Sequence, residues 1–160
     1  MSNTLSSFLT LDNVALDLNL TSMKRVIETA SLMLEKDVGI DHQTIFTALI
    51  AREKLGNTCL GGGVSLPHAR LGSAPTLRIA VIRTTQSLHT RAIDNRRAKL
   101  FFVVVIPQEG SAHFPQIVHE VRSIVENTEF KISLMKAKTP LELCQLIGNW
   151  NPPDPPQPEP

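Results

Sequence analysis

The sequence has 160 residues, 42% of them hydrophobic, and a formal net charge of +1, which fits one globular domain with a sizeable core. Its lysines and arginines are scattered rather than gathered in a basic stripe, and no apolar run reaches the roughly 18 residues of a membrane span, so neither a nucleic-acid partner nor membrane insertion is expected. The N-terminus lacks the pattern of a secretion signal, and the two cysteines are far apart in the sequence, so we expect a cytoplasmic protein.

The first third of the chain predicts a strand followed by two helices. Apolar and polar residues alternate over residues 14–20, as in a half-buried strand. Thr21 or Ser22 can cap the next helix, whose apolar residues fall on one face. A second helix is expected to begin at Asp41 and to stop before Gly56.

The middle of the chain predicts a loop and short strands. Residues 56–63 (GNTCLGGG) are rich in breaking residues and are expected to be a loop. Strands are expected at 64–66, 77–83 and 99–106. The last of these is apolar on both faces, so it should be the central strand, covered by helices on both sides.

The last third predicts helices at about 114–125, 129–137 and 140–148. Helices before and after the strands predict the α/β class, with three α/β/α layers around a central mixed sheet of about four to five strands. We expect residues 1–150 to form this domain. Residues 151–160 (NPPDPPQPEP) contain six prolines and should be disordered or polyproline-like.

The stretch GGGVSLPHAR (61–70) combines features that suit anionic chemistry. Pro67 is expected to end the preceding strand and to leave His68 at its carboxyl end, where ligand sites of open α/β sheets gather. A neutral histidine can accept a phosphoryl group on one ring nitrogen while the other nitrogen keeps its proton. A histidine with a purely structural role is the alternative reading of the same residues.

Phosphoryl transfer also requires positive charge or N–H donors around the moving oxygens. The candidates for this role are Arg52, Arg70, Thr58 and the backbone of Gly61, Gly62 and Gly63. Cys59 paired with His68 is a less favoured nucleophile, because no third orienting residue is visible. No cofactor or metal is expected, since His113 and His119 are six residues apart and do not share a helical face.

The run AREKLGNTCLGGGVSLPHARL (51–71) resembles the active-site segment of EIIA domains of the phosphoenolpyruvate-dependent phosphotransferase system. The branch it resembles is the mannitol/fructose type and, within it, the nitrogen-regulatory EIIA. The resemblance covers about residues 10–150, and the order of elements also fits the family's fold. The segment AIDN (92–95) is similar to the family's segment before the central strand.

The resemblance implies roles for individual residues. The family's phosphorylated histidine falls on His68, its helix-end arginine on Arg52 and its loop threonine on Thr58. A second active-site histidine, at the start of the helix after the central strand, falls on His113. Cys59 departs from the pattern, because the family usually has glycine there.

The function implied is that of a phosphoryl carrier and regulator. An HPr-like phosphocarrier protein (NPr) would phosphorylate His68, and the phosphorylation state would control partners such as kinases or transporters, in nitrogen- or potassium-related regulation. Such a protein is a transferase only in the sense of a carrier with a phosphohistidine intermediate. No EIIB or EIIC segment accompanies the domain, which favours a regulator. The alternatives are a fructose- or mannitol-type transport EIIA that passes the group to an EIIB cysteine, and a protein-binding module of the same fold that is not phosphorylated.

Overall fold

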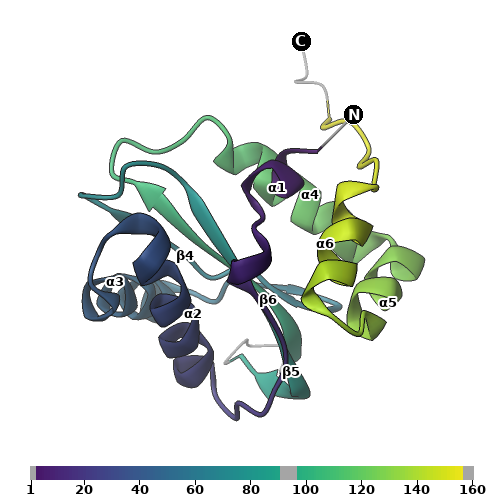
Figure 1. Ribbon diagram of the computed structural model, residues 1–160, viewed down its shortest axis with the longest axis horizontal. Helices are drawn as coiled ribbons and strands as arrows, with labels where there is room; N and C mark the ends of the chain where they lie inside the picture. The colour runs from purple at the N-terminus through teal and green to yellow at the C-terminus, as the bar shows by residue number, and fades with distance from the viewer. Residues whose placement is uncertain (1–2, 91–96, 157–160) are drawn as a thin grey trace.

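The computed structural model describes residues 3–90 and 97–156. A single mixed sheet lies between two layers of helices (Figure 1), which confirms the expected three-layer α/β/α class. The elements in chain order are α1 (Thr4–Phe8), a 3-10 turn (Leu11–Asn13), β1 (Val14–Leu18), α2 (Met23–Val38), α3 (His42–Leu55), β2 (Cys59–Gly61), β3 (Gly63–Ser65), β4 (His68–Leu71), β5 (Arg78–His89), β6 (Arg97–Pro107), α4 (Phe114–Glu126), α5 (Thr128–Lys136) and α6 (Pro140–Gly148).

The sheet is arranged around β6. In the described residues it has six strands, rather than four to five, in the order β1-β5-β6-β3-β2, with β4 also paired to β6. Strands β3 and β4 run parallel to β6 and β5 runs antiparallel to it, while β1 is parallel to β5. Since every residue of β6 from Leu100 to Pro107 is buried, the prediction of a central strand here is confirmed.

Two apolar clusters fill the spaces between the sheet and its two helical layers. Successive residues of a strand point to opposite faces, so Phe101 and Val103 contact the layer of α2 and α3, while Phe102 and Val104 contact the layer of α1, α4, α5 and α6. Figure 1 shows these helical groups on the two sides of the sheet. The sheet is therefore buried on both faces, which explains the apolar run in its central strand.

The predicted helix starts are confirmed by their caps. The side chain of Ser22, rather than that of Thr21, accepts a hydrogen bond from the backbone N–H of Arg25 at the start of α2. Asp41 caps α3 in the same way. The junction between these helices is also fixed by Glu35, whose carboxylate accepts from the backbone N–H of His42 at 2.6 Å and from its Nδ1 at 2.8 Å. These contacts set the direction of α3, whose last turn carries Arg52.

Two expectations for residues 56–70 are wrong. The segment 56–63 is not only a loop, because Cys59–Gly61 pairs antiparallel with β3. Gly61, Gly62 and Gly63 have φ angles of 89°, 62° and 85°, which glycine adopts without strain, and they form the turn of this hairpin. Strand β3 does end before Pro67, but His68 does not lie at a free carboxyl end of the sheet, since pairing with β6 resumes at His68 as strand β4.

The two ends of the described chain, at Asn3 and at residues 151–156, lie close to α6 and α4 (Figure 1). In the described part of the tail, residues 151–156 form no helix or strand, and Nε2 of His119 donates to the carbonyl of Pro153 at 2.8 Å. Residues 157–160 and the AIDN segment (92–95) lie outside the described residues.

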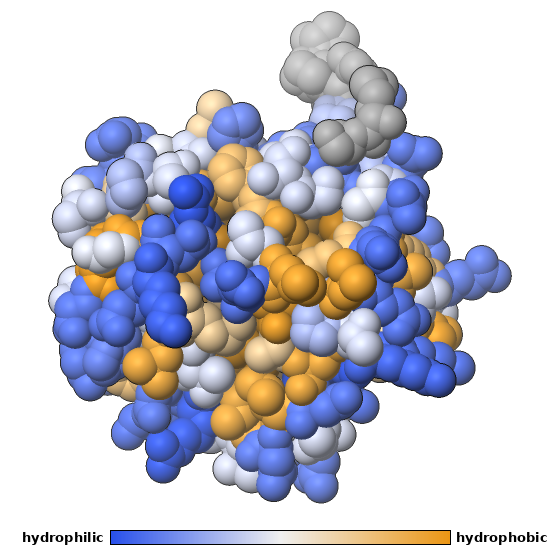
Figure 2. All heavy atoms as spheres, viewed as in Figure 1, coloured by the Kyte–Doolittle hydropathy of each residue, from blue (hydrophilic) through white to orange (hydrophobic). Residues whose placement is uncertain are grey.

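The surface seen in Figure 2 has a hydrophobic band down its middle, with hydrophilic residues on both sides. The band follows the stretch from α1 to β1, where Leu11 is 50% exposed. Among the described residues, no helix combines the length and the apolar character needed to cross a bilayer.

Candidate functional site

The candidate site is built on a strand interrupted at Pro67. Ser65 pairs with Phe101 and His68 with Val104, so β3 and β4 keep the same register along β6. Pro67 has no N–H to donate, but its carbonyl still accepts from the N–H of Val104 at 2.8 Å. His68 is therefore the first residue of a resumed strand, and its backbone is fixed by the central strand of the sheet.

One ring nitrogen of His68 is held by the backbone. Nδ1 lies 2.9 Å from the carbonyl oxygen of Leu66. A carbonyl only accepts hydrogen bonds, so Nδ1 carries a proton in this contact and Nε2 keeps a free lone pair in the neutral ring. This is the tautomer that a nucleophilic Nε2 requires.

The surroundings of His68 favour the neutral imidazole. Burial lowers the pKa of His68 most strongly, the hydrogen bond to Leu66 raises it, and the positive charge of Arg52 lowers it further. The net direction is a pKa below the ordinary value. At neutral pH the ring is thus mainly unprotonated at Nε2.

Phe114 contributes to this burial. It is the first residue of α4, and its ring centroid lies 5.0 Å from that of His68 at an interplanar angle of 43°. Pro115 follows in the first turn of the helix, a position that proline tolerates well. The start of α4 therefore packs an aromatic ring against the imidazole.

A cavity of about 610 Å³ lies beside His68. Its walls come from the last turns of α3, from β4, from the end of β6 and from the start of α4. Among the described residues, the charged groups that line it are the guanidinium groups of Arg52 and Arg70, so the cavity suits an anion. The lining residues are Ala48, Ala51, Arg52, Leu55, His68, Ala69, Arg70, Ile106, Gly110, Ser111, Phe114 and Pro115.

Both arginines have a defined place in the wall. Nη1 of Arg52 donates to the carbonyl of Gly56 at 3.0 Å, beyond the end of α3. The guanidinium of Arg70 lies over Gly110, where an added Cβ would be 3.6 Å from Nη2. The structure thus brings His68, Arg52 and Arg70 together around one cavity.

The structure places His113 next to this cavity in sequence, but not in its lining. His113 stands at the N-cap position of α4, and its backbone N–H donates to Oγ of Ser111 at 3.2 Å. Its exposed ring packs against Phe8 of α1, with centroids 5.1 Å apart.

Thr58 is buried behind the site rather than exposed to the cavity. Its hydroxyl donates to Oε1 of Glu53 and lies 3.5 Å from Oγ of Ser65. Burial raises the pKa of Glu53, while the hydrogen bonds from Thr58 and the charge of Arg52 lower it. The hydroxyl of Thr58 is therefore engaged inside the protein and does not line the cavity.

The glycine turn also lies apart from His68. Gly63 pairs with Ala98, whereas His68 pairs with Val104, six residues further along β6. Because the register shifts after Gly63, the distance is better taken along the chain, where the five residues from Gly63 to His68 span roughly 17 Å at about 3.3 Å per residue. Gly61, Gly62 and Gly63 thus lie at the other end of the interrupted strand, where Gly62 faces the side chain of Lys131 in α5.

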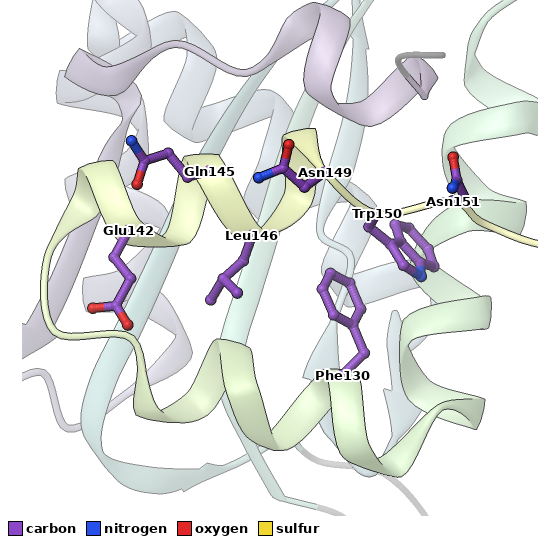
Figure 3. Close-up of a pocket in the computed structure, with 7 residues that line it drawn as sticks. All are labelled: Phe130, Glu142, Gln145, Leu146, Asn149, Trp150 and Asn151. Carbon is purple, nitrogen blue, oxygen red and sulfur yellow. The ribbon is translucent and has the colours of Figure 1, made fainter.

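A second hollow, of about 490 Å³, lies along α5 and α6 (Figure 3). The rings of Phe130 and Trp150 stack in it, with centroids 4.7 Å apart. Its one charged lining residue is Glu142, whose carboxylate disfavours an anion. Of these two hollows, the cavity at His68 is therefore the better suited to an anion.

The chain is similar to known proteins over most of its length. Residues 7–150 match the family model described as "Phosphoenolpyruvate-dependent sugar phosphotransferase system, EIIA 2". The chain belongs to this EIIA family. The EIIA domain is similar to the nitrogen regulatory protein of Pseudomonas aeruginosa, with 29% identity over 127 residues, which are 79% of this chain and 82% of that protein.

Solved structures place the EIIA domain in the same fold. The crystal structure of nitrogen regulatory protein IIA-Ntr from Neisseria meningitidis matches with a TM-score of 0.81 and 30% identity, over 89% of this chain and 98% of that chain. The mannitol IIA of Escherichia coli matches with a TM-score of 0.73 and 16% identity, over 87% and 98%. The expected resemblance to a nitrogen-regulatory EIIA is confirmed.

Proposed function

We propose that this EIIA domain accepts a phosphoryl group on Nε2 of His68 from a phosphorylated HPr-like protein (NPr), and that its phosphorylation state controls the binding of partner proteins. The observation that carries the proposal is the hydrogen bond from Nδ1 of His68 to the carbonyl of Leu66. It leaves Nε2 as the nucleophilic atom, beside a cavity lined by two arginines. Membership of the EIIA family supports the same chemistry.

The transfer step uses few protein groups. The lone pair of Nε2 attacks the phosphorus of the donor's phosphohistidine, a P–N bond forms to His68, and the P–N bond to the donor breaks with its electron pair left on the donor nitrogen. Arg52 and Arg70 balance the negative charge of the phosphoryl oxygens. The His68 ring keeps its Nδ1 proton and becomes positively charged, which the carbonyl of Leu66 stabilises.

The rim of the cavity is suited to act as a switch. Leu55 is 85% exposed at the end of α3, and Pro115 is exposed on the opposite wall. A phosphoryl group adds about two negative charges beside these apolar residues. Partners that bind the apolar rim of the free form would then lose affinity for the phosphorylated form.

The regulatory branch is favoured over a transport EIIA. The support is the similarity to the two nitrogen regulatory proteins at 29% and 30% identity. On this basis the partners would be cytoplasmic regulatory targets, such as kinases or transporters, in nitrogen- or potassium-related regulation.

Reconstitution tests the proposal. The protein is incubated with enzyme I, the HPr-like protein and phosphoenolpyruvate, and one acid-labile phosphoryl group per chain is expected. His68→Gln should take up none, while His89→Gln, on β5, serves as the matched control. Labelling of His68→Gln at the wild-type rate would show that another residue is the acceptor. His113→Gln is the companion variant. The resemblance implies that His113 takes part in transfer, whereas its ring packs against Phe8.

A further inference from the structure

A chain of hydrogen bonds connects Glu53, in the last turn of α3, to the imidazole of His68. Oε1 of Glu53 accepts from the hydroxyl of Thr58. The carbonyl of Thr58 accepts from the N–H of Leu66 at 3.0 Å. The carbonyl of Leu66 accepts from Nδ1 of His68 at 2.9 Å. Both polar groups of the Leu66 residue are thus used, one toward Thr58 and one toward His68.

The middle of this chain of hydrogen bonds is buried. Thr58 is 6% exposed and Ser65 is 1% exposed, with their hydroxyl oxygens 3.5 Å apart. Buried polar groups are costly to leave without a partner. Removal of the Glu53 carboxylate leaves the Thr58 hydroxyl with the longer contact to Ser65, which frees Thr58 to reorient.

The hydrogen-bond chain passes through the break between β3 and β4. Leu66 lies between β3 and β4, and the next residue, Pro67, offers no N–H. The N–H of Leu66 donates its hydrogen bond to the carbonyl of Thr58. The orientation of the Leu66 carbonyl accordingly depends on a segment that Glu53 holds in place.

We infer that Glu53 is a positioning residue for phosphoryl transfer: through Thr58 it holds Leu66 so that the Leu66 carbonyl fixes His68 in the tautomer with a proton on Nδ1. The inference rests on the proposed function, in which Nε2 of His68 carries the phosphoryl group. Glu53 itself does not line the cavity, so it touches neither the donor nor the phosphoryl oxygens.

Two pairs of variants test this role. Glu53→Ala and Thr58→Val each break the first link, and Val keeps the volume of Thr. Both should show a mixture of His68 tautomers in ¹⁵N NMR, and the maximal rate of phosphoryl uptake should fall about tenfold, because misplacement of a reacting group slows transfer strongly. The concentration of phosphorylated HPr-like protein that gives half the maximal rate should stay the same.

Conservative variants separate positioning from general stability. Glu53→Gln and Thr58→Ser keep an acceptor and a donor, and both should restore the tautomer and bring the rate to within about twofold of wild type. Gly62→Ala controls for lost stability, since it strains a turn far from His68. A wild-type tautomer and a wild-type rate in folded Glu53→Ala would overturn the inference. If Glu53→Ala does not fold, the same result in folded Thr58→Val would overturn it. The tautomer is measured without any phosphoryl transfer, so failure of the proposed function would appear separately, as a wild-type protein that is not phosphorylated.

Discussion

At His68, burial and hydrogen bonding act on the same ring in opposite directions. Burial lowers its pKa, whereas the carbonyl of Leu66, which accepts from Nδ1, raises it. Burial is the larger effect, and Phe114 supplies an aromatic face 5.0 Å away. The imidazole is therefore neutral and oriented before any donor binds, so little of the barrier to transfer lies in preparing the nucleophile.

The lowered pKa of His68 predicts the pH dependence of uptake. Protonation of Nε2 removes the nucleophilic lone pair, so the rate should be constant through neutral pH and should fall only at a pH below 6.5, the ordinary value. Phe114→Ala exposes the ring and should move the midpoint upward, whereas Phe114→Leu should move it less. NMR titration of His68 gives the midpoints directly. A wild-type midpoint above 6.5 would contradict this explanation.

Arg52→Ala should slow phosphoryl uptake by about 100-fold, because it removes a positive charge next to the transferring group. The fold should remain, since the hydrogen bond of Arg52 to Gly56 is exposed. Arg25→Ala, on the exposed surface of α2, is the control. Single-turnover kinetics and circular dichroism measure the two effects. Unchanged kinetics would indicate that Arg52 only caps the end of α3 and takes no part in transfer.

At the scale of elements, the interrupted strand separates the glycine turn from His68, although the two are neighbours in the sequence. The glycine turn of the β2–β3 hairpin lies roughly 17 Å from His68 along the sheet, by strand geometry. The glycines whose backbone N–H groups the sequence suggested as hydrogen-bond donors to a phosphoryl group instead form a tight turn against α5. Stability and transfer should accordingly respond to different residues of the stretch 61–70.

Gly62→Ala tests this separation. Its φ is +62°, and an added Cβ would lie 2.7 Å from Nζ of Lys131 and 3.2 Å from Cγ1 of Val125. We expect a loss of about 1–2 kcal/mol in the free energy of unfolding with no change in the rate of phosphoryl uptake. Gly148→Ala is the matched control, because nothing lies within 4 Å of its added Cβ. A slower phosphoryl uptake by folded Gly62→Ala would indicate that the glycine turn takes part in transfer after all.

Most of the elements predicted from the sequence have a long pattern. Helices α2 to α6 have apolar periodicity over many residues, together with capping residues such as Ser22, Asp41 and Thr139, and the central strand β6 has a continuous apolar run. The three-residue strand β2 and the five-residue helix α1 are too short to show a period. Strand β4 was missed because Pro67 normally ends a strand, and only its pairing with β6 shows that the strand resumes.

At the scale of the whole molecule, the N-terminal segment is fastened to the layer that holds α4. Glu120 is 1% exposed, and its carboxylate accepts from the backbone N–H groups of Thr4 and Leu5 at 3.1 and 2.8 Å. Nδ2 of Asn3 donates to the carbonyl of Ile147 at 2.7 Å. These contacts join the two ends of the chain around α4, the helix that brings Phe114 to His68.

Glu120→Ala should lower the free energy of unfolding by about 2–3 kcal/mol, because the buried N–H of Leu5 and the partly buried N–H of Thr4 lose their acceptor. Glu126→Ala, at the exposed end of the same helix, should have little effect. Chemical denaturation of the two variants gives the comparison. If the two variants unfold at the same denaturant concentration, the N-terminal segment is not held by Glu120.

How much of the site the sequence predicts depends on whether its parts are close in the chain. His68, Arg70 and Arg52 were proposed from the segment 51–71, and the structure places all three around one cavity. Phe114 was not singled out, because its contact with His68 depends on how the end of β6 leads into α4. Thr58 is near His68 in sequence, but its hydroxyl turns inward to Glu53, a contact that no local pattern reveals.

The most direct measurement is combined ³¹P and ¹⁵N NMR of the protein after phosphorylation by enzyme I and the HPr-like protein. One phosphoryl group bonded to Nε2 of His68, with the proton still on Nδ1, is the predicted result. A phosphoryl group on Nδ1 of His68, or on any other residue, would contradict it.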